Sequence, residues 1–198
     1  ALESRLRQLL GDSIELEMSL DATLGSIQAD PVQLQKAIVN LVTNARDAIP
    51  ARGEVRVETR RFSVSDEAGV EGPALEPGEY AMLTVADSGR GMDRETCSRL
   101  FEPFFTTKDP ARAAGLGLAL TYGMAKQSNG DVQVETAPGR GTTIRLYLPV
   151  SAVAAAPAVA PAQPPPIETQ PAEETAVEFK NVLLVVEEGG IRSLVRKM

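Results

Sequence analysis

The segment from Asp30 to Ile49 constrains the fold more than any other stretch, because it predicts a helix with one apolar face. Asp30 suits an N-cap, Pro31 fits the first helical position, and Gln33 follows at capping-box spacing. At about 100° per residue, one face collects the apolar side chains Leu34, Ile38, Leu41, Val42, Ala45 and Ile49. This face belongs to a core.

The other face of this helix carries a narrow polar stripe of Asn40, Asn44 and Asp47. Most polar stripes on helices only contact water, so the stripe alone is weak evidence for a binding site. It does present amide and carboxylate oxygens in a row. The remaining motifs of the chain decide between these two interpretations.

Composition excludes several kinds of site. The 198 residues are 43% hydrophobic, which is enough for one good core. Without histidine and with Cys97 as the one cysteine, the sequence offers no histidine triad, no His-ligated metal and no cysteine zinc cluster. A net charge of −7 argues against a nucleic-acid-binding surface.

The sequence shows no apolar run near the roughly 20 residues of a membrane helix, and no signal-peptide pattern. We therefore expect a cytoplasmic setting without membrane contact for this stretch of chain. A longer parent protein with membrane segments stays open.

Hydrophobic periodicity predicts interleaved strands and helices rather than a regular βαβ series. The expected elements are strands at 13–20, 54–64, 79–87, 131–137 and 142–149, and helices at 31–48, 93–100 and 116–128. We expect an α/β fold of the two-layer α/β sandwich type, with a mixed, mostly antiparallel sheet and helices on one face.

An Ala- and Pro-rich segment at 151–178 contains no Lys or Arg, and its scattered prolines forbid a continuous helix. This predicted linker separates a domain at 12–150 from a short C-terminal segment at 179–198.

Three glycine-rich stretches punctuate the domain: DSGRGM at 87–92, AAGLGLAL at 113–120 and APGRGTT at 137–143. None has the spacing of a P-loop or a dinucleotide-binding fingerprint. Asp87 ends a strand before two glycines, where a carboxylate can accept a hydrogen bond from an exocyclic amine. AAGLGL opens a helix whose free N–H groups favour a phosphate. FEPFFTTK, which ends in Lys108, precedes that helix as a candidate lid with a phosphate-facing cation.

Taken in order, the asparagine pair, DSGRG, FEPFFTTK, GLGLAL and GRGTTIRLYLP resemble the catalytic ATP-binding domain of bacterial sensor histidine kinases. That family shares a superfamily with DNA gyrase and mismatch-repair ATPases. The resemblance covers roughly residues 12–150 and implies a Bergerat-type fold that binds ATP and Mg²⁺.

The resemblance also implies roles for individual residues. Asn44 would supply an oxygen to Mg²⁺, a hard cation, and Asn40 and Asp47 would line the metal and phosphate site. Asp87 would hold the adenine amine. The other residues implied at the nucleotide are Gly89, Gly91, Met92 and Thr142 near adenine, and Lys108, Gly115, Leu116, Gly117 and Leu118 near the phosphates.

Asn40 separates the branches of the superfamily. The ATP-hydrolysing relatives carry a water-activating glutamate at this position, whereas an amide is not a useful base. We therefore expect the domain to donate the γ-phosphoryl group to a histidine on an upstream dimerisation domain, whose second helix would end within residues 1–11. No catalytic residue is expected in this chain, which cannot autophosphorylate on histidine.

Two alternatives stay open: an ATP-gated clamp ATPase of the gyrase or mismatch-repair kind, and a regulatory pseudokinase module. Ala113 stands where the family's lid usually has a further glycine.

Residues 179–198 resemble the start of a response-regulator receiver domain, with Glu187 and Glu188 at its Mg²⁺-binding acidic pair. This implies a hybrid kinase whose receiver is truncated here; a strand and helix packing on the main domain is the alternative. The implied partners are the upstream dimerisation domain and a receiver domain. Without the dimerisation domain we expect a monomer.

Overall fold

A single mixed β-sheet organises the domain. The computed structural model describes residues 2–27, 29–64, 75–108 and 114–151, in which the strand order is β1-β2-β3-β5-β4. The strands are β1 (Ile14–Ser19), β2 (Gly53–Val64), β3 (Gly78–Asp87), β4 (Asp131–Thr136) and β5 (Thr142–Pro149). β1 and β2 pair in parallel, and the other neighbours pair antiparallel. The predicted mixed, mostly antiparallel sheet is confirmed.

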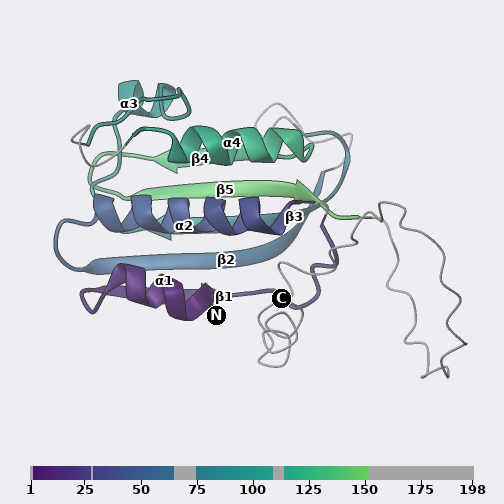
Figure 1. The fold of residues 1–198 in the computed structure, drawn as a ribbon, viewed down its shortest axis with the longest axis horizontal. Coiled ribbons are helices and arrows are strands. Elements are labelled where there is room, and N and C mark those ends of the chain that lie inside the picture. Colours follow the sequence, from purple (N-terminus) through teal and green to yellow (C-terminus); the bar gives the residue numbers. More distant parts are fainter. Residues whose placement is uncertain (1, 28, 65–74, 109–113, 152–198) are drawn as a thin grey trace, which may run out of the picture.

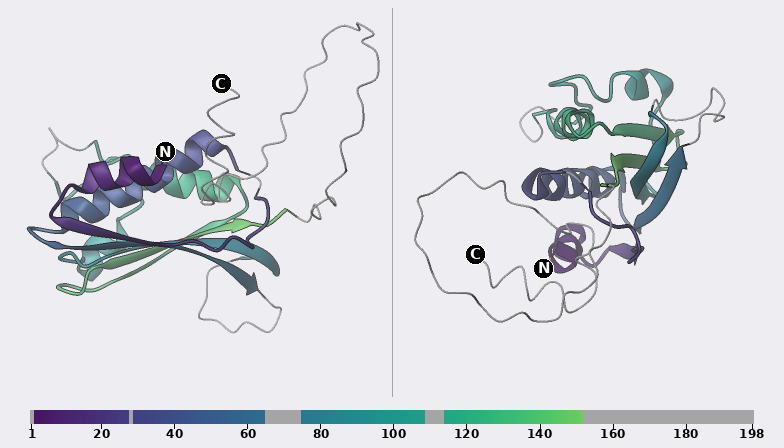
Figure 2. Two further views of the ribbon diagram at one scale, coloured as in Figure 1. Left: turned by 90° about the horizontal axis from the view of Figure 1, so that it is seen from below. Right: turned by 90° about the vertical axis from the view of Figure 1, so that its right-hand side faces the viewer.

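Three helices form the second layer. α1 (Leu2–Leu10), α2 (Pro31–Ala48) and α4 (Gly117–Gln127) lie side by side on one face of the sheet (Figure 1), and Figure 2 shows the two layers edge-on. The short α3 (Arg94–Ser98) lies outside this layer. The structure is thus the predicted two-layer α/β sandwich.

α2 forms for the reasons that its sequence suggests. The side chain of Asp30 accepts hydrogen bonds from the backbone N–H groups of Val32 at 2.8 Å and Gln33 at 3.2 Å. Pro31 occupies the first turn, where a missing N–H costs nothing. The predicted apolar face is buried, with the side chains of Leu34, Ala37, Ile38, Leu41, Val42 and Ala45 in the core.

α1 belongs to the same core. Leu6 is 0% exposed and Leu10 is 4% exposed, and both lie in the hydrophobic cluster that includes α2 and the sheet. An amphipathic helix of nine residues is too short to be stable alone, so this packing holds it in place. Its continuity with a helix of an upstream dimerisation domain stays a prediction.

Four helix and strand ends lie together at one end of the sheet: the end of α2, the start of β2, the end of β3 and the start of β5. β3 runs antiparallel to β2, so Asp87 pairs with Val55 near the start of β2. β5 runs antiparallel to β3, so Thr142 at its start pairs with Asp87. Because only a short turn separates the end of α2 from Gly53, the last turn of α2 lies at this same end.

Several predictions concern residues that the structure does not describe. These are the linker after residue 151, the C-terminal segment with Glu187 and Glu188, and Ala113 in the candidate lid. Within the described ranges, no helix is both long and apolar enough to span a membrane.

Candidate functional site

A cavity of about 500 Å³ opens at this end of the sheet. Its size lies within the range of small-molecule sites. Eleven of the predicted site residues line it: Asn44, Asp47, Asp87, Gly91, Met92, Lys108, Gly115, Leu116, Gly117, Leu118 and Thr142. The cavity therefore joins the last turn of α2, the ends of the two central strands and the start of α4.

Asp87 is the carboxylate on the sheet side of the cavity. The backbone N–H of Gly89 donates to its Oδ1 at 2.8 Å, and the backbone of Thr142 also hydrogen-bonds to this carboxylate. Burial raises the pKa of Asp87, and these two hydrogen bonds offset the rise only in part. Since a carboxylate has about four acceptor sites, it can accept a further hydrogen bond from an amine in the cavity.

A small hydroxyl network fixes the wall beside Asp87. Thr136 Oγ1 lies 3.1 Å from Thr142 Oγ1, accepts from the backbone N–H of Met92 at 3.0 Å, and contacts the carbonyl oxygen of Gly141 at 3.0 Å. Thr142 is only 7% exposed. Its hydroxyl is thus already part of a protein network, and its predicted contact with adenine stays a prediction.

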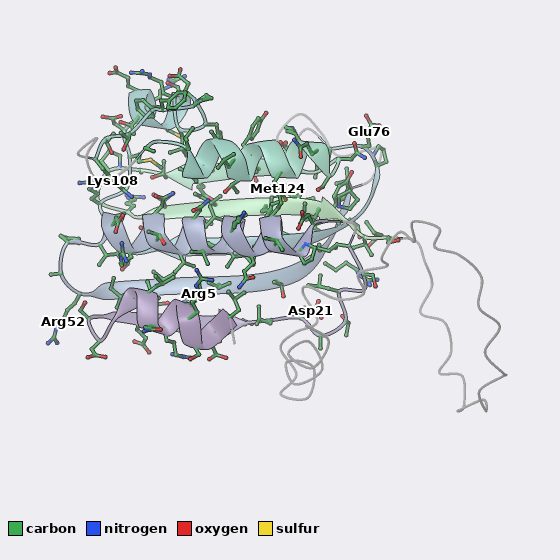
Figure 3. All side chains as sticks on the ribbon, in the orientation of Figure 1. Arg5, Asp21, Arg52, Glu76, Lys108 and Met124 are labelled. Atoms are coloured by element: carbon green, nitrogen blue, oxygen red, sulfur yellow. The ribbon has the colours of Figure 1, made fainter. Side chains whose placement is uncertain are left out.

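The last turn of α2 forms the polar end of the cavity. Lys108 Nζ donates to Asn44 Oδ1 at 2.9 Å and to Asp47 Oδ2 at 2.8 Å. Figure 3 shows Lys108 beside this end of α2. Burial acts to raise the pKa of Asp47, but hydrogen bonds and positive charge from Lys108 and Arg46 outweigh it and hold the pKa below its usual range. Asp47 is therefore ionised at neutral pH.

The start of α4 faces the cavity without a side-chain cap. Leu116 precedes the helix, and no side chain there accepts a hydrogen bond from the first turn. Gly115 has φ +67°, and a Cβ on it would lie 2.5 Å from the carbonyl carbon of Phe104. Phe104 also donates its N–H to the Gly115 carbonyl at 3.0 Å. A helix start held this way offers N–H groups and a positive dipole end to an anion.

Asn40 and Gly89 are absent from the cavity wall formed by the described residues. Asn40 Nδ2 instead donates to the Gly117 carbonyl at 3.4 Å, which ties α2 to the start of α4. Gly89 packs on the end of α2, where a Cβ would lie 2.6 Å from the Ala48 carbonyl oxygen. The contacts predicted for these two residues with metal and adenine stay predictions.

A hard cation fits the oxygens at the end of α2. Asn44 Oδ1 and Asp47 Oδ2 converge on one ammonium group, so their geometry already suits a positive charge. The described part of the chain contains no group of three or more acidic, Cys or His side chains that could hold a metal. A Mg²⁺ ion at this place would therefore need phosphate or water oxygens to complete its coordination.

Sequence reasoning missed several residues of the wall. They include hydroxyl, charged and apolar side chains: Thr43, Ala48, Arg90, Asp93, Thr96, Phe105, Thr106, Thr107 and Ile144. Thr43 stands next to Asn44, and Arg90 lies within DSGRGM, so proximity to the motifs could have indicated both. Ile144 likewise lies within GRGTTIRLYLP, whereas Thr96 lies outside the motifs, and only the fold brings it here.

Residues 29–152 match the family model described as "Histidine kinase-, DNA gyrase B-, and HSP90-like ATPase". The chain belongs to this family. The curated relatives that it matches are sensor kinases, so it carries the catalytic ATP-binding domain of the histidine kinase branch.

Two relatives show how much of a kinase is present. The chain is 36% identical over 148 residues to "Sensor kinase CckA" of Brucella abortus (strain 2308), covering 75% of this chain and 16% of that protein. It is 35% identical over 138 residues to "Signal transduction histidine-protein kinase AtoS" of Escherichia coli (strain K12), covering 70% of this chain and 20% of that protein.

Solved structures agree with this assignment. The "Mycobacterial sensor histidine kinase MprB" structure superposes with a TM-score of 0.56 at 25% identity, covering 75% of this chain and 89% of that chain. Full-length ShkA in complex with AMPPNP superposes with a TM-score of 0.55 at 25% identity, covering 78% of this chain and 31% of that chain.

Proposed function

We propose that this domain binds Mg-ATP and donates the γ-phosphoryl group to a histidine on an upstream dimerisation domain. One observation carries the proposal: a single cavity joins the partly buried Asp87 to the Asn44–Asp47–Lys108 group and the start of α4. ATP has two matching ends, a flat base with an exocyclic amine and a polyanion that binds a cation. The ShkA structure, which contains AMPPNP, supports a nucleotide as the ligand.

Each wall has a task in this proposal. Asp87 accepts a hydrogen bond from the adenine amine, beside Gly91 and Met92. Lys108 and the first backbone N–H groups of α4 contact the phosphates. Asn44 and Asp47 hold Mg²⁺, which supplies charge neutralisation on the phosphate oxygens when bound.

The carboxylates of the described cavity wall favour transfer over hydrolysis, since none of them is a free base near the phosphates. Asp47 is neutralised by two cations, which makes it a weak base. Asp93 accepts the Thr96 backbone N–H at 2.7 Å and caps α3. Asn40, where hydrolysing relatives carry glutamate, is an amide that donates to Gly117. Positioning and charge stabilisation then supply the catalysis.

The matched region is a small part of the kinase relatives, 16% and 20% of their lengths, so further domains belong to the proposal. The sequence contains no histidine, so the acceptor has to come from outside it. We infer that the partners are a histidine-containing dimerisation domain and a response-regulator receiver domain, that the setting is cytoplasmic, and that this chain alone is monomeric.

Calorimetric titration of Mg-ADP and a non-hydrolysable ATP analogue into the chain tests the proposal. We expect binding in the micromolar range, a loss of binding in Asp87→Asn, and a weaker Mg²⁺ dependence in Asn44→Ala. Addition of a histidine-containing dimerisation domain with labelled ATP then tests transfer. An unmutated, folded chain that binds no nucleotide would contradict the proposal, and steady ATP hydrolysis by the isolated chain would favour the clamp ATPase alternative.

A further inference from the structure

Lys108 fills the cation position at the end of α2. Its ammonium nitrogen lies 2.9 Å from Asn44 Oδ1 and 2.8 Å from Asp47 Oδ2. Asn44 and Asp47 share a face of α2 because they are three residues apart. Lys108 reaches them from the segment after α3, 61 residues beyond Asp47 in the chain. The two oxygens therefore form a ready pair of ligands that already holds one positive charge.

A divalent cation needs the same two oxygens. Mg²⁺ binds oxygen ligands at about 2.1 Å, so an ammonium group bonded to both would leave two cations only a few ångströms apart. The side chains of Lys108 and Asp47 are 28% and 29% exposed, so water screens this repulsion only in part. Lys108 therefore has to leave these oxygens before a divalent cation can bind them.

Arg46 keeps Asp47 in place when Lys108 leaves. Its Nε and Nη2 donate to Asp47 Oδ1 at 2.9 and 2.7 Å, and its Nη1 donates to the carbonyl of Leu9 in α1 at 3.3 Å. A planar guanidinium held on both sides is a fixed partner, whereas the flexible stem of a lysine lets its ammonium group move to another anion. Asp47 thus has one fixed and one exchangeable cation.

Polyphosphate is the anion that can receive Lys108. A free metal ion would displace the ammonium group without offering it another negative group, whereas a metal–nucleotide complex brings both the cation and the phosphates. We propose that Lys108 occupies the cation position until nucleotide binds, so that a divalent cation enters only together with nucleotide phosphates. This inference rests on the proposed function, and it makes the metal–nucleotide complex, rather than the free metal, the ligand of the site.

Titration of Mn²⁺ alone into the full chain, followed by the electron paramagnetic resonance signal of free Mn²⁺, tests this proposal. Lys108→Met removes the charge and keeps an unbranched side chain, and we expect it to bind Mn²⁺ at least about tenfold more tightly than the unmutated chain. Lys108→Arg keeps the charge, so we expect its Mn²⁺ affinity to stay close to that of the unmutated chain.

Lys36→Met is the matched control, because Lys36 lies on the exposed face of the same helix and changes the net charge equally. A Lys108→Met chain that binds Mn²⁺ no better than Lys36→Met would overturn the proposal. The proposal would also be overturned if Lys108→Met still bound Mn²⁺ more tightly after Asp47→Asn had been added to the same chain. Calorimetric titration of Mg-ADP distinguishes a failure of this inference from a failure of the proposed function. An unmutated chain that binds no nucleotide refutes the proposed function. A chain that binds nucleotide but whose Lys108→Met variant binds Mn²⁺ no more tightly refutes only the role of Lys108.

Discussion

Gly141→Ala tests the close approach of Gly141, the residue before β5, to the backbone at the end of β3. A Cβ on Gly141 would lie 1.9 Å from the Asp87 carbonyl oxygen and 2.9 Å from its carbonyl carbon. Real Cβ contacts are essentially never shorter than 3.0 Å, so the start of β5 has to move by about 1 Å. Gly139 is a matched control, since its φ of +75° is almost that of Gly141 at +74° and a Cβ on Gly139 would meet no described atom within 4 Å.

The difference between the two substitutions isolates the steric effect. Both variants bear the cost of a left-handed alanine, about 1–2 kcal/mol. Gly141→Ala also strains the hydrogen bonds between Thr136 and Gly141 and between Asp87 and Thr142. At about 1 kcal/mol per bond, these two bonds add about 2 kcal/mol. For a domain of this size we expect Tm to fall by about 3–6 °C in Gly139→Ala and by about 9–12 °C in Gly141→Ala.

Thermal unfolding monitored by circular dichroism measures the two Tm values, and calorimetry at about 15 °C, below both expected transitions, measures nucleotide binding by the folded variants. We expect Gly139→Ala to bind Mg-ADP like the unmutated chain and Gly141→Ala to bind at least about tenfold more weakly, because Asp87 moves. Equal Tm values for the two variants would refute the steric argument, since their backbone strain is the same.

Four further substitutions have expected outcomes. Asp87→Asn should raise Tm at pH 7, because burial raises the pKa of Asp87 and makes its charged form costly in the folded state. This gain in Tm should shrink as the pH falls toward about 4, where the carboxylate becomes protonated in both states. A gain in Tm that does not depend on pH would contradict this reasoning. Phe104→Asn should keep or raise Tm, since the side chain of Phe104 is 74% exposed and its φ is +67°. Phe101→Ala should cost about 2–3 kcal/mol, because it removes a ring whose centroid lies 4.9 Å from that of the stacked Tyr122 ring. Similar Tm values for these two variants in a thermal melt would contradict both expectations. Arg56→Ala should leave the denaturant midpoint of unfolding almost unchanged, because its ion pairs are exposed, and a clear fall in the midpoint would mean a cooperative network.

Local patterns predicted the elements well because their signals lie within one turn or one strand. The Asp30 cap and the apolar face of α2 are both present as expected. The motif residues also converge on one cavity, since a family resemblance carries the fold with it. The exceptions are Asn40, which contacts the start of α4, and Gly89, which packs against the end of α2.

Other features depend on contacts between distant segments, which no short pattern encodes. The alternation in residues 13–20 predicts a strand but not its parallel pairing with β2. The ten N-terminal residues predict a helix but not that Leu6 is fully buried in the core of this domain. The bond between Lys108 and Asp47 joins segments 61 residues apart, and both residues were predicted at the site without being predicted to contact each other.

The central position of β3 and β5 has a consequence for local unfolding. Both strands are hydrogen-bonded along both edges, so we expect the amides within them to exchange with solvent more slowly than those of segment 101–108. Lys108 and Phe105 lie outside any helix or strand, so their segment can open without the sheet. We therefore expect the wall of the cavity on the sheet side to open more rarely than the wall that carries Phe105 and Lys108.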